Sequence, residues 1–277
     1  MIARTYLRIK RSHAAAIGLS IVLLAALVGV LGPIITGSPT AIGNDAFVSP
    51  GTQYLLGTDD LGRDMLVRMA HGARISLLVG FAAASFSAVI GIVVGALAGF
   101  AGGKIDEFFM RVAEAFQVVP QFFLAILIVA LFGPSLFKIV VVIGILSWPS
   151  TARIIRAEFL KLRGQDFVVA ARLSGASRSA LIFSEILPNA LPPVIVNASL
   201  QIASAVLTES NLSFLGLGDP DKISWGQLLF GAQPFLNSAP WMAIFPGLAI
   251  LITALGFNLL GDGFNDLLDP RQKGSIR

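Results

Sequence analysis

Long apolar runs without Asp, Glu, Lys or Arg are the feature that most constrains the fold of this chain. The runs lie at His13–Ile35, Ile75–Phe100, Phe116–Leu131, Ile139–Trp148, Leu187–Leu207 and Pro240–Leu260. A helix crosses a bilayer with roughly 20 apolar residues. Only 13% of the 277 residues are charged, against about 25% in a soluble domain, so a water-exposed globule is excluded. We therefore expect an all-α integral membrane protein with six transmembrane helices, the third and fourth of them forming a hairpin.

The positive charges between these runs predict the topology. Four Lys or Arg residues precede the first run, two follow the second, six follow the fourth and three follow the last. Only five lie in the segments on the opposite side. Cytoplasmic segments carry the excess of Lys and Arg in membrane proteins, so we expect both termini in the cytoplasm. The net charge of +4 is then explained by topology and gives no reason to expect a nucleic-acid partner.

The absent residue types exclude several kinds of chemistry. The chain has no cysteine and two histidines, His13 and His71, that are far apart in sequence. Disulfides, thiolate metal sites and cysteine nucleophiles are therefore excluded. Neither a GxxxxGK[ST] phosphate loop nor an HExxH zinc motif occurs. We expect no catalytic residue, no metal site and no cofactor in this chain.

The longest predicted cytoplasmic segment runs from Thr151 to Glu185. Its first part, Arg153–Arg163, mixes charged and apolar residues and predicts a helix that extends from the membrane into water. A second, short helix follows and is predicted to end at Gly175, because glycine supports the left-handed turn that ends many helices. The small side chains of Ala170 and Ala171 would let a partner protein approach it closely.

The outer segment between the first two runs contains the sequence LGTDDLGRD at Leu56–Asp64. We expect Thr58 or Asp59 to cap a helix, and Asp64 to pair with Arg68 on its surface. The alternative is that the acids and Arg63 bind substrate or a docked protein. The candidate residues of this motif are Gly57, Asp59, Gly62, Arg63 and Asp64.

Two helical stripes mark the apolar runs. Small residues recur every four positions on the second run, at Ser87, Gly91, Gly95 and Gly99, which favours close helix packing within the bundle. Polar residues on the fifth run share one face, at Asn197, Gln201, Ser204 and Thr208. Polar groups in a spanning helix favour a water-filled path; the alternative for this stripe is hydrogen bonding between helices.

The cytoplasmic segment resembles the EAA loop of permease subunits of bacterial ABC importers. Val169-Ala170-Ala171 is followed by Gly175 and then by Ile186-Leu187-Pro188, with Val169 where the family has Glu. Five further segments strengthen the resemblance and narrow it to the C-type permeases of dipeptide, oligopeptide and nickel importers. They are LGTDDLGRD, GARISL from Gly72, LSFLGLG from Leu212 after Glu209, and FNLLGD and DLLDPR between Phe257 and Arg271.

This resemblance implies a type I ABC importer permease fold in a bacterial inner membrane. It implies that the chain imports di- or oligopeptides, with nickel or a metal chelate as the alternative, together with a homologous second permease, two ATPase subunits and an extracytoplasmic substrate-binding protein. ATP and Mg would bind the ATPase subunits, and the chain itself would not be an enzyme. The expected contact with an ATPase consists of Phe167, Ala170, Ala171, Arg172, Leu173 and Gly175.

The expected organisation has two parts. Residues 1–74 would form an N-terminal cytoplasmic segment, the first transmembrane helix and the outer loop. Residues 75–277 would form a five-helix permease core that contains a cytoplasmic coupling loop at 151–187. The rivals of other classes are a membrane enzyme and a structural assembly subunit.

Overall fold

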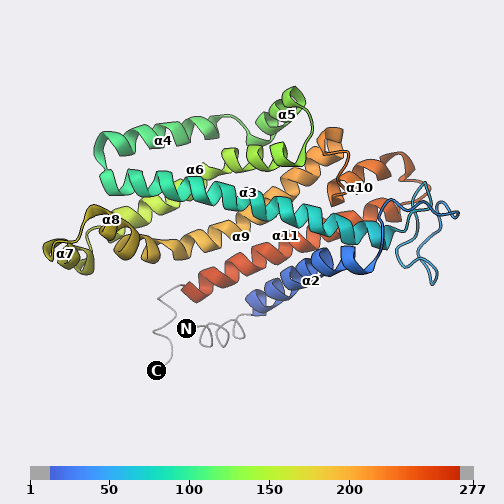
Figure 1. Ribbon diagram of the computed structural model, residues 1–277, viewed down its shortest axis with the longest axis horizontal. Helices are drawn as coiled ribbons and strands as arrows, with labels where there is room; N and C mark the ends of the chain where they lie inside the picture. The colour runs from blue at the N-terminus through green and yellow to red at the C-terminus, as the bar shows by residue number, and fades with distance from the viewer. Residues whose placement is uncertain (1–12, 269–277) are drawn as a thin grey trace.

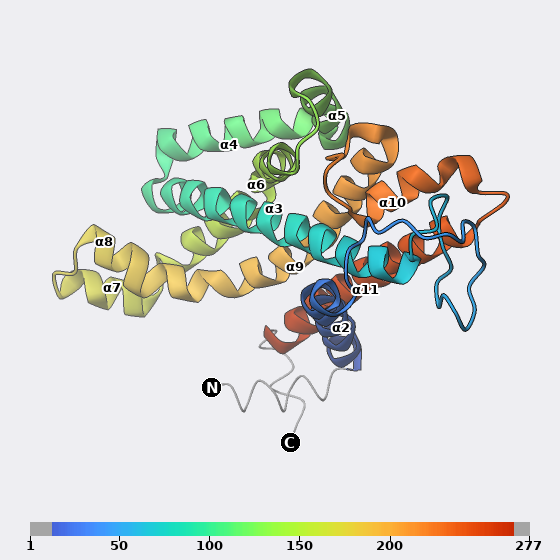
Figure 2. The ribbon, with the colours of Figure 1, turned by 45° about the vertical axis from the view of Figure 1, so that its right-hand side comes forward.

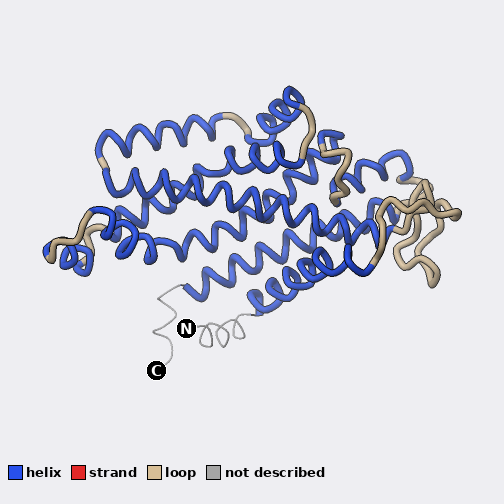
Figure 3. The backbone as a smooth tube through the Cα atoms, viewed as in Figure 1, coloured by secondary structure: helices blue, strands red, loops and turns tan. Residues whose placement is uncertain are grey.

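The computed structural model describes residues 13–268, and within them it is built from helices and connecting loops (Figures 1 and 3). Five segments are long and apolar enough to cross a membrane, and a bent helix pair brings the number to six. The five are α2 (His13–Ile35), α3 (Met65–Ala101), α6 (Leu136–Leu162), a continuous segment over Arg178–Leu217 that contains α9 (Leu187–Leu212), and α11 (Trp241–Leu268). The expected all-helical membrane fold is confirmed. The N-terminal and C-terminal basic residues used for the topology lie outside the described residues.

The third predicted span is the one that the structure corrects. Instead of one helix over Phe116–Leu131, there are two, α4 (Gly103–Val118) and α5 (Gln121–Phe132), bent by 80° at the break between them. Pro120 explains the break, because proline has no N–H to donate and disfavours the helical conformation of the residue before it. Val119 accordingly has extended backbone angles, φ −90° and ψ 131°.

Several other helices extend beyond the apolar runs. α3 begins at Met65, so the predicted boundary at residue 74 falls inside a helix. α6 continues through Pro149 to Leu162, which places the first part of the predicted coupling loop on a helix. α9 continues to Leu212, beyond the end of the apolar run at Leu207, and therefore includes Glu209. In each case polar or charged side chains belong to a helix whose ends the apolar pattern does not mark.

The α3–α6 pair lies at the centre of the bundle, where small residues let the two backbones approach (Figure 1). A Cβ atom on Gly91 would lie 2.5 Å from the Thr151 side chain, and one on Gly95 would lie 2.4 Å from the backbone oxygen of Ala152. A Cβ atom on Gly99 would lie 2.6 Å from Phe159. The predicted small-residue stripe therefore packs within this bundle.

The first span packs along the last one through a second set of glycines. Cβ atoms on Gly18 and on Gly263 would clash with the backbone of α11 and with Ala15, respectively. The described beginning of α2 and the described end of α11 consequently lie at the same end of the bundle, opposite the loop of residues 36–64 (Figures 1 and 2). We call the end that carries this loop the outer end, as the charge pattern predicts.

The α3–α6 contact makes a stability prediction. Gly95→Val should lower the free energy of unfolding of the detergent-solubilised chain by about 2 kcal/mol, the usual cost of overpacking, because the new side chain meets backbone. Gly247→Val on α11 is the matched control, since a Cβ atom there has no neighbour within 4 Å among the described residues outside its own helix turn. Thermal unfolding followed by circular dichroism measures both. Equal losses for the two variants would contradict the close α3–α6 contact.

Candidate functional site

A short helix, α7 (Asp166–Leu173), projects from the end of α6 at the end of the molecule opposite the outer loop (Figure 2). It is attached by Val168, whose side chain is fully buried in an apolar cluster. The cluster joins Ile155 and Phe159 of α6 to Leu181 and Ile186 of the segment that follows α7. Burial of an aliphatic side chain of this size contributes about 1.5–3 kcal/mol, so α7 is held on α6 by more than its loops.

The end of α7 has the predicted glycine turn. Gly175 has a φ of +84°, in the left-handed region that favours glycine. The amide of Ser174 donates to Ala170 O over 3.0 Å, and the amide of Ala176 donates to Ala171 O over 3.1 Å. These bonds satisfy carbonyls that would otherwise lack partners at the end of the helix. The prediction of a short helix that ends at Gly175 is confirmed.

The other face of α7 is apolar and exposed. Leu173 exposes 84% of its surface, Phe167 41% and Val169 40%, and Ala170 and Arg172 are exposed beside them. Ala171 is half-buried and packs with the anchoring cluster. Val169, at the position where the resemblance leads one to expect Glu, therefore adds apolar surface to this face. Exposed apolar residues gathered on one projecting element indicate a protein-contact surface.

The outer motif has a different helix cap from the predicted one. α3 begins at Met65, and Asp64 caps it by accepting from the amide of Leu66 over 2.7 Å. The prediction that Thr58 or Asp59 caps the helix is wrong. The chain reaches the cap through two tight turns in which Gly57 and Gly62 have φ values of +75° and +70°, and these conformations explain why glycine occurs at both positions.

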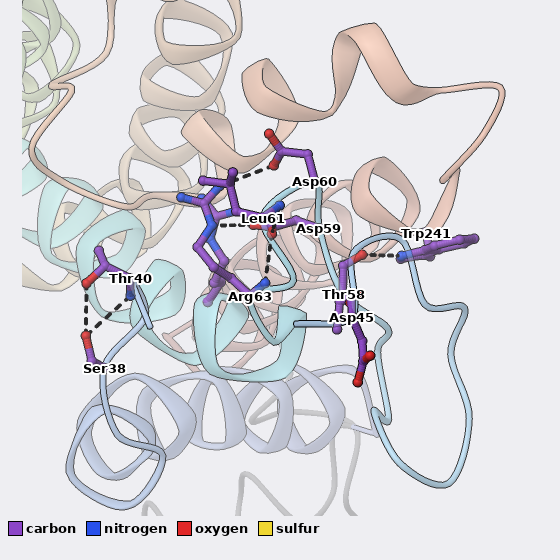
Figure 4. A network of polar contacts seen from close by, with 10 residues as sticks. Ser38, Thr40, Asp45, Thr58, Asp59, Asp60, Leu61, Arg63 and Trp241 are labelled. Carbon is purple, nitrogen blue, oxygen red and sulfur yellow. Dashed lines mark hydrogen bonds and ion pairs between the residues drawn. The ribbon is translucent and has the colours of Figure 1, made fainter. Parts of the chain in front are cut away.

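Asp59 is instead a fully buried carboxylate at the centre of the motif (Figure 4). It accepts from the amides of Leu61 and Arg63, both at 2.9 Å, and from Arg63 Nε at 2.6 Å. A fourth donor is Arg68 Nη1. The prediction that Asp64 pairs with Arg68 is therefore wrong, because Arg68 pairs with Asp59. Two cations and two amides compensate the burial of one carboxylate.

The motif is also tied to the last span. Trp241 Nε1 donates to Thr58 O over 3.0 Å, and the Thr58 hydroxyl donates to Asp45 O over 2.7 Å (Figure 4). These contacts fix the outer loop on the first turn of α11. The polar groups of Thr58 and Asp59 are thus occupied within the chain, and the partly exposed charged groups of the motif are Asp60, Arg63 and Asp64.

Two members of the polar stripe on α9 contact α6. Asn197 Nδ2 donates to Thr151 Oγ1 over 3.0 Å, and Gln201 Nε2 donates to Ser150 Oγ over 2.7 Å. Thr208 donates to the Ser204 carbonyl of its own helix, and Ser204 itself is exposed. The contacts of Asn197 and Gln201 are the helix-to-helix bonds that the alternative interpretation describes, and their role in a substrate path stays a prediction.

Sequence reasoning missed a helix, two polar contacts between elements and the burial of one acidic residue. The missed helix is α10 (Trp225–Ala232). Ser224 caps its beginning, and the Ser224 hydroxyl accepts from the Gln227 amide over 3.1 Å. The Ser-x-x-Gln spacing is a capping-box signal that predicts this start. No sequence signal predicts the Asp106–Arg156 ion pair between α4 and α6, the bond from the Leu136 amide to Asp219, or the burial of Glu209. Within residues 13–268, no three His, Cys, Asp or Glu side chains gather in a way that would hold a metal ion.

Comparisons with known proteins agree along most of the chain. The family described as binding-protein-dependent transport system inner membrane component matches residues 91–274. The dipeptide transport system permease protein DppC of Alkalihalophilus pseudofirmus is 38% identical over 96% of this chain and 88% of its own length. The oligopeptide transport system permease protein OppC of Bacillus subtilis is 39% identical over the same shares. A chain of the inward-facing MetNI methionine ABC transporter has a TM-score of 0.59 at 20% identity and covers 74% of this chain and 98% of its own.

The burial of Asp59 makes a further stability prediction. Asp59→Asn should destabilise the chain by about 3–5 kcal/mol, because removing one charge of a buried pair leaves its partners uncompensated. Asp60→Asn should cost less than about 1 kcal/mol, since its contact with Arg63 is 3.4 Å long and solvent-accessible. Thermal unfolding of the two variants in the same detergent provides the comparison. A loss for Asp59→Asn no larger than that for Asp60→Asn would refute the central role of this carboxylate.

Proposed function

The chain belongs to the family of binding-protein-dependent transport system inner membrane components, and from this premise we propose that it is the permease subunit of an importer of dipeptides or oligopeptides. It is a multi-pass inner-membrane protein of an ABC transporter with an ABC importer permease fold, and such permease subunits are not catalytic. The observation that carries the peptide assignment is the likeness to two peptide permeases over 96% of the chain.

The exposed face of α7 is the proposed contact with an ATPase subunit. Phe167, Ala170 and Leu173 would enter a groove of the ATPase, with Arg172 at the polar edge and Ala171 next to the contact. Gly175 would allow the close approach, since within residues 13–268, its chain neighbours apart, no atom lies within 4 Å of a Cβ placed there. This arrangement is supported by the 84% exposure of Leu173 and the full burial of Val168 in the same short helix.

Movement of the ATPases would reach the membrane through α6. Val168 packs on Ile155 and Phe159 of α6, and α6 is packed against α3 along the glycine stripe. A pull on α7 therefore acts on one continuous helix of 27 residues. Because packed cores shift between discrete arrangements and do not deform continuously, α6 and α3 would move together.

The substrate path would lie between this chain and a homologous second permease, with one ATPase subunit under each. On this chain, the proposed lining is the open side of α9 around Ser204 and Thr208. Asn197 and Gln201 would contribute through the parts of their amides that do not contact α6. Asp60 and Arg63 of the outer motif would meet the substrate-binding protein. Import of nickel or a metal chelate by the same architecture remains the alternative substrate assignment.

Transport by the reconstituted complex tests both the substrate and the coupling. Proteoliposomes that contain the two permeases, the two ATPases and the binding protein should take up tritiated tri-alanine when ATP is supplied, and should not accumulate nickel-63. Gly175→Trp should reduce this uptake by about tenfold or more, since an interface penalty of only about 1.4 kcal/mol has that effect. ATP binding should be retained.

Two variants serve as controls for the glycine. Gly175→Ala has the same left-handed strain, about 1–2 kcal/mol, without the bulk. Gly164→Trp has the bulk at another open position next to α7. Both should retain most of the uptake. Normal transport by a Gly175→Trp complex that still holds its ATPases would refute the coupling proposal, and nickel uptake without tri-alanine uptake would refute the peptide proposal.

A further inference from the structure

Glu209 is an acidic residue buried near the outer end of the bundle, with 1% of its surface exposed. It lies on α9, where α9 meets α3 and α10. Among the residues that the structure describes, no ion pair involves its carboxylate. A buried carboxylate without a cation is costly unless hydrogen bonds replace its lost water.

Four serine hydroxyls lie around the Glu209 carboxylate. Ser213 Oγ donates to Glu209 Oε1 over 2.7 Å, and Ser210 Oγ faces Oε2 at 3.5 Å. The hydroxyls of Ser76 of α3 and of Ser224 at the start of α10 lie beside the same carboxylate, where each can donate to it. Ser210 therefore belongs to α9 and Ser213 to the turn that directly follows it, whereas Ser76 and Ser224 come from other parts of the chain.

Ser76 and Ser224 each accept a hydrogen bond from a backbone amide, which leaves the hydroxyl proton of each free to be donated. Ser76 Oγ accepts from the Trp225 amide over 3.1 Å, and Ser224 Oγ accepts from the Gln227 amide over 3.1 Å. Each hydroxyl has one proton, which is left to donate to Glu209. A carboxylate only accepts hydrogen bonds, so the acceptor matches the donors. The side-chain amide of a glutamine at position 209 would direct N–H groups at some of these hydroxyl donors.

The segment Asp219–Gly226, which we call the outer clasp, joins three spans at this point. Trp225 Nε1 donates to Met69 O of α3 over 3.1 Å. Asp219 Oδ2 accepts from the amide of Leu136, the first residue of α6, over 2.9 Å. A Cβ atom on Gly226 would lie 2.6 Å from Ser210 Cα of α9. The clasp thus contacts the outer ends of α3, α6 and α9, and Glu209 lies between it and the bundle.

We propose that Glu209 is a positioning residue for transport, which holds the outer clasp on α3 and α9 so that the outer ends of α3, α6 and α9 move as one body. The inference rests on the proposed permease function, in which α6 carries movement from α7. If α10 separated from α3 and α9, the carboxylate would lose the hydroxyl of Ser224, and Ser76 Oγ would lose the amide of Trp225. The cost of that loss opposes the separation, so movement of α6 reaches the outer mouth without loosening it.

The test uses the reconstituted complex with Glu209→Ala and Glu209→Gln chains. Amide hydrogen exchange of Trp225–Ala232 should become about tenfold faster or more in Glu209→Ala, the effect of losing a hydrogen bond to a charged group, and less so in Glu209→Gln. ATP hydrolysis should continue but should depend less on the binding protein, and tri-alanine uptake per ATP should fall. A purely structural role would change the amount of complex and leave uptake per ATP unaltered.

Two serines on α3 distinguish the effect of the hydroxyls around Glu209 from the effect of general packing. Ser76 and Ser87 are both fully buried, but the Ser87 hydroxyl has no hydrogen-bond partner in the part of the chain that the structure describes. Ser76→Ala should reproduce the faster exchange and the lower uptake per ATP, and Ser87→Ala should not. Because Ser76→Ala removes one hydroxyl only, it provides the same measurements if Glu209→Ala fails to assemble.

Unchanged exchange of α10 and unchanged uptake per ATP in either Glu209→Ala or Ser76→Ala would overturn the proposal. So would equal effects of Ser76→Ala and Ser87→Ala. A wild-type complex that hydrolyses ATP in response to the binding protein but takes up no tri-alanine would refute the peptide assignment alone. In that case hydrogen exchange and the dependence of hydrolysis on the binding protein still decide whether Glu209 holds the clasp.

Discussion

The close contact between α3 and α6 is the constraint on which the rest of the structure depends. Gly91, Gly95 and Gly99 let the two backbones meet over residues 148–159 of α6. In lipid, where burial of apolar surface gives no advantage between helices, such van der Waals contact is what holds spans together. The contact fixes α6 as the rigid element of the bundle, and the features at its two ends depend on that rigidity.

One end of α6 carries α7 and the other meets the outer clasp. At the α7 end, Val168 is buried against Ile155 and Phe159, so the short helix follows α6 when it moves. At the outer end, the first amide of α6 donates to Asp219 of the outer clasp, and the clasp also contains Ser224, one of the serines around Glu209. A displacement applied at one end therefore acts on contacts at both ends. If α7 contacts an ATPase as proposed, this geometry gives a physical route from that ATPase to the outer end of the bundle.

Much of this fold follows from local sequence patterns, and the differences have physical causes. Apolar runs locate the spans because only an internally hydrogen-bonded helix is stable in lipid, and Gly175 marks the end of α7 because its conformation favours glycine. The break at Pro120 was missed because the apolar run continues through it. Glu209 was misplaced for a different reason, since its surroundings include Ser76 from a distant segment, and nothing within its own segment indicates such a partner. The donors to Asp59 are local, Leu61, Arg63 and Arg68, but the spacing does not show which acid of the motif they enclose.

The central claim is that the exposed face of α7 contacts an ATPase subunit, and site-specific cross-linking tests it most directly. The chain has no cysteine, so Leu173→Cys introduces the only thiol and takes a benzophenone maleimide at the most exposed apolar position of α7. Illumination of the assembled complex in membranes should give a covalent product of this chain with an ATPase subunit. A product with lipid or with the second permease, without any ATPase product, would contradict the account.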